Sequence, residues 1–99
     1  MFRGTTPTLE FVLPFDTNLL SEAYVTISQR KQIVIDKSMQ QCECNENKLI
    51  VKLSQEETLK LFCTDMAEIQ IRAKTLTGDA LASDIIRVWV SEILKNGVI

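Results

Sequence analysis

The chain has 99 residues, of which 45% are hydrophobic and 24% are charged, and its formal net charge is −2. This composition excludes a disordered or fibrous chain and predicts one globular domain over residues 1–99. The basic residues are scattered, and the longest apolar runs fall far short of the roughly 20 residues that cross a bilayer. We therefore expect neither nucleic acid nor a membrane among the partners.

The opening residues, MFRGTTPTLEF, lack the basic segment and apolar run of a secretion signal. The chain also has three cysteines, an odd number that is typical of a reducing compartment with free thiols. We therefore expect a protein that is made in the cytoplasm.

Apolar residues alternate with polar ones over most of the chain, a pattern typical of strands with one buried face. The first run covers residues 8–13 and stops at Pro14, which cannot donate to a ladder. Residues 23–28 and 32–36 follow, joined by a hairpin through residues 29–31, and a turn at 45–47 leads into residues 48–53. The side chains expected to point inward are Leu9, Phe11, Leu13, Ala23, Val25, Ile27, Ile33, Ile35, Leu49, Val51 and Leu53.

A capping box interrupts this alternation at Ser54, since Glu57 follows three residues later. In such a box the hydroxyl and the carboxylate each satisfy a backbone N–H at the start of a helix. The spacing predicts one short helix near residues 55–61, and Leu59 and Phe62 are expected to dock it on the edge of a sheet.

Alternation resumes at residues 67–75, where Ala67, Ile69, Ile71 and Ala73 are expected to point inward. A turn at 77–79 precedes a long last strand, from about Leu81 to Leu94. Six or seven short strands and one crossing helix predict an all-β protein, and more specifically an immunoglobulin-like antiparallel β-sandwich.

The only tryptophan lies in this last strand, within the run IIRVWV of residues 85–90. Alternation places Ile86, Val88 and Val90 on one face, and it places Ile85, Arg87 and Trp89 on the other. Trp89 either lies under a loop or the helix, or belongs to a protein interface, where aromatic side chains are enriched. In the interface reading Trp89, Ile85 and Tyr24 are the anchors and Arg87 supplies an orienting charge. Outward residues that extend this apolar patch are Val12, Val34 and Ile50.

Residues that carry chemistry are few. The chain has no histidine, no glycine-rich phosphate loop and no catalytic serine or metalloprotease motif, and Glu56 and Glu57 are better explained as helix-capping residues. Cys42, Cys44 and Cys63 are the only metal-ligand candidates, but structural zinc prefers four ligands. We expect no enzyme, no cofactor and no metal. A metal protein that uses the three thiols is a third alternative, which the zinc content of the purified chain would test.

Three segments carry a family resemblance: RGTTPTLEFVLPFD (residues 3–16), VKLSQEETLKL (51–61) and the final stretch from IQIRAKT to NGVI (69–99). They resemble small virion-associated proteins encoded in phages and prophages of Firmicutes. More loosely, they are similar to the N-terminal domain of the phage baseplate upper protein. The resemblance implies an immunoglobulin-like sandwich that docks to other phage proteins and has no catalytic residues.

Two functional hypotheses follow from these observations. In the first, the chain is a non-enzymatic structural or accessory protein of the virion, at the head, neck, tail or baseplate. It then assembles with other phage structural proteins or as a homo-oligomer through the outer face of its last strand. In the second, it is a small monomeric regulatory protein of a mobile element that docks a host protein by edge-strand pairing.

Overall fold

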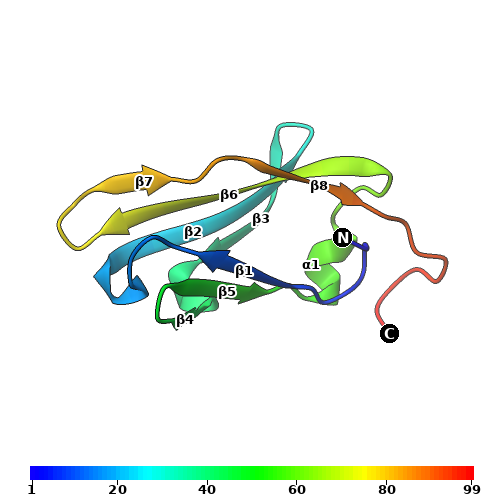
Figure 1. Cartoon of the computed structure of the whole chain (residues 1–99). Helices are drawn as coiled ribbons and strands as arrows, with labels where there is room; N and C mark the ends of the chain where they lie inside the picture. Colours follow the sequence, from blue (N-terminus) through cyan, green and yellow to red (C-terminus); the bar gives the residue numbers. More distant parts are fainter.

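The computed structural model describes residues 1–99 and is mostly β, with two antiparallel sheets and one α-helix. The elements in chain order are β1 (Thr8–Val12), η1 (Thr17–Leu19), β2 (Leu20–Gln29), β3 (Gln32–Ser38), η2 (Met39–Gln41), β4 (Glu43–Asn45), β5 (Lys48–Lys52), α1 (Gln55–Leu59), β6 (Asp65–Thr75), β7 (Ala80–Ala82) and β8 (Ile86–Val90). The five-stranded sheet has the order β3-β2-β6-β7, and β8 pairs with β6 as well. The three-stranded sheet has the order β1-β5-β4 and forms a second layer (Figure 1).

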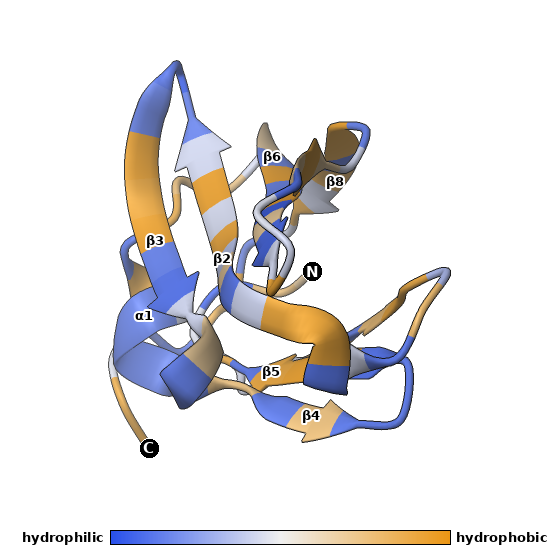
Figure 2. Cartoon of the chain, turned by 90° about the vertical axis from the view of Figure 1, so that its left-hand side faces the viewer, coloured by the Kyte–Doolittle hydropathy of each residue, from blue (hydrophilic) through white to orange (hydrophobic).

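The core lies between the two sheets and follows the predicted alternation. Val25, Ile27 and Ile69 of the five-stranded sheet are buried, as are Leu49 and Val51 of the three-stranded sheet. Bands of apolar and polar residues alternate along β2, whereas the apolar residues of β3 form one block at positions 33–35 (Figure 2). The inward positions are therefore confirmed for most of the chain, and Leu9, Phe11, Leu13 and Ala73 pack against the core while partly buried.

The helix is shorter than expected, and one of its two expected docking residues is exposed. It covers Gln55–Leu59 and lies at the end of the molecule where both chain termini are found (Figure 1). The capping box is present, because the Ser54 hydroxyl accepts from the Glu57 N–H at 3.1 Å and the Glu57 carboxylate accepts from the Ser54 N–H at 2.9 Å. Of the two residues expected to dock the helix, Leu59 is half-buried and Phe62 is exposed. The fully buried residues of this segment are Thr58 and Leu61.

The Phe62 ring is exposed because hydrogen bonds to the Phe62 backbone fix this part of the chain. The buried side chain of Gln29 donates to the Phe62 carbonyl at 2.9 Å and accepts from the Phe62 N–H at 2.7 Å. This pair of bonds fixes the chain after α1 and turns the ring outward, where the guanidinium of Arg30 lies 4.0 Å from the ring centroid.

A β-bulge corrects the assignment of Ile33. The register moves from Ile27↔Ile35 to Ser28↔Ile33, so Val34 is the extra residue in β3. The alternation reverses at the bulge, and Ile33 is 68% exposed although it was expected to point inward.

The last strand is two strands, which raises the total to eight together with the short β4. Ser83 interrupts the pairing, because its hydroxyl accepts from the Ile71 N–H at 3.0 Å in place of a backbone carbonyl. The register with β6 changes from Arg72↔Ala82 to Ile69↔Ile86, so this strand also carries one extra residue. The extra residue places Leu81 on the inner side of the sheet and Trp89 on the outer side.

The N-terminal residues form an ordered arm along β8. Phe2 and Ser91 form a parallel bridge, the Met1 ammonium donates to the Trp89 carbonyl at 2.9 Å, and the Arg3 N–H donates to the Ser91 carbonyl at 3.1 Å. The arm then turns at Gly4, whose φ of +76° is readily adopted by glycine. No helix in the chain has the length and apolar character needed to cross a membrane.

Candidate interaction surface

All four predicted interface residues lie on the outer face of the five-stranded sheet. Trp89 and Arg87 belong to β8, Ile85 directly precedes it, and Tyr24 belongs to β2. Trp89 is 51% exposed, and Ile85, Tyr24 and Arg87 are exposed as well. The same face carries the predominantly polar side of β6, so its apolar residues stand among charges.

Trp89 has two apolar neighbours on this face. Met66 is its register partner on β6, and Phe2 of the N-terminal arm pairs with Ser91, two residues further along the edge of β8. Phe2 and Met66 are 58% and 41% exposed. We call Phe2, Met66 and Trp89 the Trp89 patch. Three adjacent segments, the arm, β8 and β6, each contribute one large exposed apolar side chain to it.

Sequence reasoning missed two members of this patch. Met66 directly precedes the alternating run of residues 67–75, and extending that run by one residue places Met66 on the polar face beside Glu68. No sequence pattern around Phe2 indicates that its side chain belongs to this face. Its position depends on a bridge to Ser91, which lies 89 positions later in the chain.

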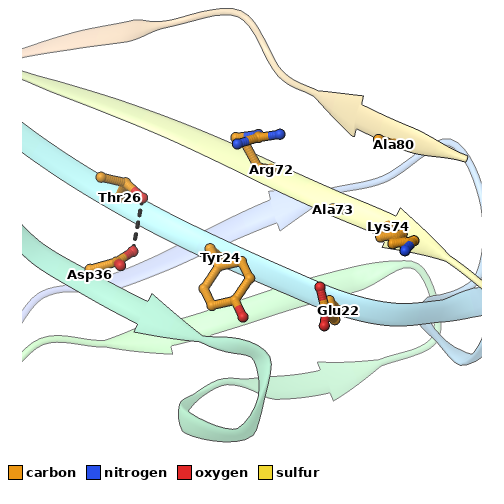
Figure 3. A pocket seen from close by; sticks show the side chains of 8 residues that line it. All are labelled: Glu22, Tyr24, Thr26, Asp36, Arg72, Ala73, Lys74 and Ala80. Carbon is orange, nitrogen blue, oxygen red and sulfur yellow. Dashed lines mark hydrogen bonds between the residues drawn. The ribbon is translucent and has the colours of Figure 1, made fainter.

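Tyr24 lies away from the Trp89 patch. It pairs with Arg72, whereas Trp89 pairs with Met66, and the separation of six positions between Met66 and Arg72 corresponds to roughly 20 Å of strand. Tyr24 instead stands among charged residues, including Glu22, Arg72 and Lys74 (Figure 3).

The predicted extension of the patch to three further outward residues is wrong. Val12 and Ile50 belong to β1 and β5 of the three-stranded sheet, and Val34 is the partly buried bulge residue of β3. A continuous apolar patch across these positions does not form, because Val12 and Ile50 lie in the other layer and Val34 packs against the core.

A shallow hollow of about 200 Å³ occupies the middle of the outer face. Its polar floor includes Thr26, Ser28 and Gln70, and Ile33 and Ile85 flank it. Next to the hollow, the Arg87 guanidinium lies 3.6 Å from the Glu68 carboxylate, an exposed ion pair that links β8 to β6.

A second surface lies on the side of the molecule where β1 and β7 form sheet edges. A groove of about 490 Å³ runs between them and is mainly apolar. Its lining includes Phe11, Leu13, Phe15, Leu81 and Ile86. The Pro7 carbonyl and the Leu13 N–H both bond toward β5, so alternation directs the N–H groups of Glu10 and Val12 to the free edge of β1.

The three cysteines are free and do not come together in a metal site. Cys42 follows η2, Cys44 lies in β4, and Cys63 lies between α1 and β6. No group of three or more potential metal ligands occurs in the structure. Burial, and secondarily the neighbouring Cys44, raises the pKa of the Cys42 thiol against the opposing effect of Lys37. Cys42 is therefore a poor nucleophile at neutral pH.

Comparisons with known proteins leave the structure as the basis for assigning function. No protein-family model, no curated protein and no solved structure matches the chain.

Proposed function

We propose that the chain is a non-enzymatic docking module with an immunoglobulin-like sandwich fold, and that it docks through the outer face of its five-stranded sheet. The observation that carries this proposal is the Trp89 patch. Met66 pairs with Trp89 and Phe2 bridges Ser91, so three large exposed apolar side chains lie on adjacent segments of one face. Interface cores favour such aromatic and methionine side chains.

The proposed setting is a phage virion, where the partners are other phage structural proteins. This part of the proposal rests on the resemblance of residues 3–16, 51–61 and 69–99 to virion-associated proteins. Capsid or tail genes beside the gene for this chain would support it. Early regulatory genes at that position would instead favour the mobile-element hypothesis.

The test is a binding experiment with the purified products of the neighbouring genes, followed by light scattering after size exclusion. We expect the native chain to form a complex that Trp89→Lys abolishes. Leu76→Lys is the matched control, because Leu76 is an exposed apolar residue beyond β6 and lies outside the Trp89 patch. Equal binding by both variants would contradict the proposal, as would a native chain that binds none of these products and does not self-associate.

Edge-strand pairing is the second candidate, favoured by the apolar groove beneath the free edge of β1. An added strand would receive hydrogen bonds from Glu10 and Val12 and place alternate side chains in the groove. Val12→Pro tests this mode, since it removes an outward N–H at a sheet edge and leaves the pairing of β1 with β5 intact. If binding survives Trp89→Lys and is lost in Val12→Pro, the edge and not the outer face is the docking site.

A further inference from the structure

The charges on the outer face are sorted by strand around Tyr24. In β2 the carboxylate of Glu22 precedes Tyr24, and the neighbouring strand β6 presents Arg72 and Lys74 (Figure 3). The register sets Glu22 opposite Lys74 and Tyr24 opposite Arg72. At these paired positions β2 therefore presents an acidic and an aromatic side chain, and β6 presents two basic side chains.

The charged side chains around Tyr24 have no ionic or hydrogen-bonding partner within the chain. The four ion pairs of the molecule are Arg30–Asp65, Lys37–Glu57, Lys48–Glu10 and Arg87–Glu68. The side chains of Glu22, Arg72 and Lys74 make no ion pair and no hydrogen bond, although all three are exposed on adjacent strands. They are free to meet charges on another molecule.

We infer that the partner on this face is a second copy of the same chain, an inference that rests on the proposed docking function. The two copies pack face to face about a two-fold axis that runs parallel to the strands, between β2 and β6. Such an axis lays β6 of each copy over β2 of the other at the same level. Each outward-facing pair between β2 and β6 in one chain then corresponds to a contact between the chains, and the two-fold axis makes that contact twice, as in any isologous interface.

The contacts that this axis creates are complementary in charge. Lys74 meets Glu22 of the second copy, and the Arg72 guanidinium meets the ring of Tyr24 of the second copy, an arrangement suited to a cation–π contact. At the next level the amide of Gln70 faces Thr26 of the second copy, so no like charges are opposed there. Complementary charges of this kind fix the register of an interface.

The apolar residues of the face add to the same packing. Ile33 on β3 lies level with Ser28, and Arg87 on β8 lies level with Glu68, so the axis brings Ile33 beside Arg87 and Ile85 of the second copy. The Trp89 patch faces the end of the partner hairpin between β2 and β3. The aligned strand directions that result are a common form of sheet packing.

The area of the face suits a dimer. An 11-residue strand and four strands abreast give a face roughly 36 Å long and about 19 Å wide, or roughly 700 Å². A stable interface of standard size buries about 800 Å² on each partner. The outer face is therefore close to the size needed without help from the edges.

A charge-swap experiment tests the inference by sedimentation equilibrium at low salt over a concentration series. We expect the native chain to approach twice the monomer mass of 11.2 kDa. Glu22→Lys and Lys74→Glu should each weaken the dimer by about tenfold or more, because each creates two like-charge contacts. The variant that carries both substitutions should recover dimerisation, since opposite charges then face each other again across the interface.

A net-charge control is available on the other sheet. Lys52→Glu changes the charge as Lys74→Glu does but lies on β5, and it should leave the dimer unchanged. Thermal unfolding of every variant checks that the fold persists. A native chain that stays monomeric, or a double variant as weak as the single ones, would overturn the inference.

The two proposals fail separately. A monomeric native chain that still forms a Trp89-dependent complex with a neighbouring gene product overturns the second-copy partner and leaves the docking face in place. Loss of both the dimer and that complex overturns both proposals.

Discussion

The two faces of the five-stranded sheet are made by the same strands and differ in what satisfies their side chains. On the inner face, Val25 and Ile27 of β2 are sealed against the three-stranded sheet, and even the polar Gln29 has both ends of its amide bonded. On the outer face, Glu22, Arg72 and Lys74 have no partners and Trp89 is half exposed. The contrast indicates that the inner face holds the fold together and that the outer face is available for binding.

The largest expected effect comes from neighbouring residues of β2 that point to opposite faces. Ile27→Ala should lower the free energy of unfolding by about 2–5 kcal/mol, because it leaves a cavity in a packed core. Thr26→Ala on the outer face creates no core cavity, but it removes the hydrogen bond from the Thr26 hydroxyl to Asp36 at 2.9 Å, so it should cost only about 1 kcal/mol. Urea unfolding monitored by circular dichroism measures both, and similar losses in the two variants would contradict the assignment of faces.

A second contrast uses the same substitution at two glutamines. Gln29→Leu should cost about 1–3 kcal/mol, because it leaves the N–H and carbonyl of Phe62 without their partners in a buried site. Gln70→Leu removes a single exposed bond to the Ser83 carbonyl and should cost much less. Equal stability of the two variants would show that the Gln29 bonds do not anchor the segment after α1.

A third contrast compares two ion pairs by their dependence on pH. Burial disfavours ionisation of Glu57, but hydrogen bonds from Lys37 and Ser54 outweigh it and hold the pKa of this carboxyl below its ordinary 4.5. The carboxylate therefore stabilises the fold above pH 4.5, and this contribution is lost as the pH falls through the folded value. Glu57→Gln should make the decline of the unfolding free energy below pH 4.5 shallower.

The exposed pair on the outer face supplies the control. Arg87 and Glu68 are 3.6 Å apart with exposed side chains, whereas Lys37 and Glu57 are 2.7 Å apart and largely covered. Arg87→Met should leave both stability and its pH dependence nearly unchanged, since exposed pairs contribute little. A pH profile altered as much by Arg87→Met as by Glu57→Gln would contradict this ranking.

Local patterns predicted the all-β class, the helix start at Ser54 and most of the core, because alternation and capping depend on residues close in sequence. These patterns failed where one extra residue in a strand reversed the alternation of inward and outward side chains. The bulge at Val34 exposed Ile33, and Ser83 divided the last strand by bonding to Ile71. Neither event has a sequence signal as strong as the alternation that it interrupts.

The candidate surface was predicted only in part. Alternation within residues 85–90 placed Trp89 and Ile85 on the outer side, but it could not show which strands would lie beside them. Met66 and Phe2 join Trp89 through pairings with β6 and with the N-terminal arm, contacts between residues distant in sequence. The same long-range register sets Lys74 opposite Glu22, a relation that the sequence alone does not contain.

The fluorescence of Trp89 tests the central claim most directly, because the chain has only one tryptophan. Acrylamide quenching is measured from dilute to concentrated protein, with Lys74→Glu in parallel. If the outer face is the docking surface and a second copy covers it, quenching of the native chain should fall as concentration rises while that of Lys74→Glu stays high. Equal quenching of the native chain at every concentration, up to the solubility limit, would contradict the account.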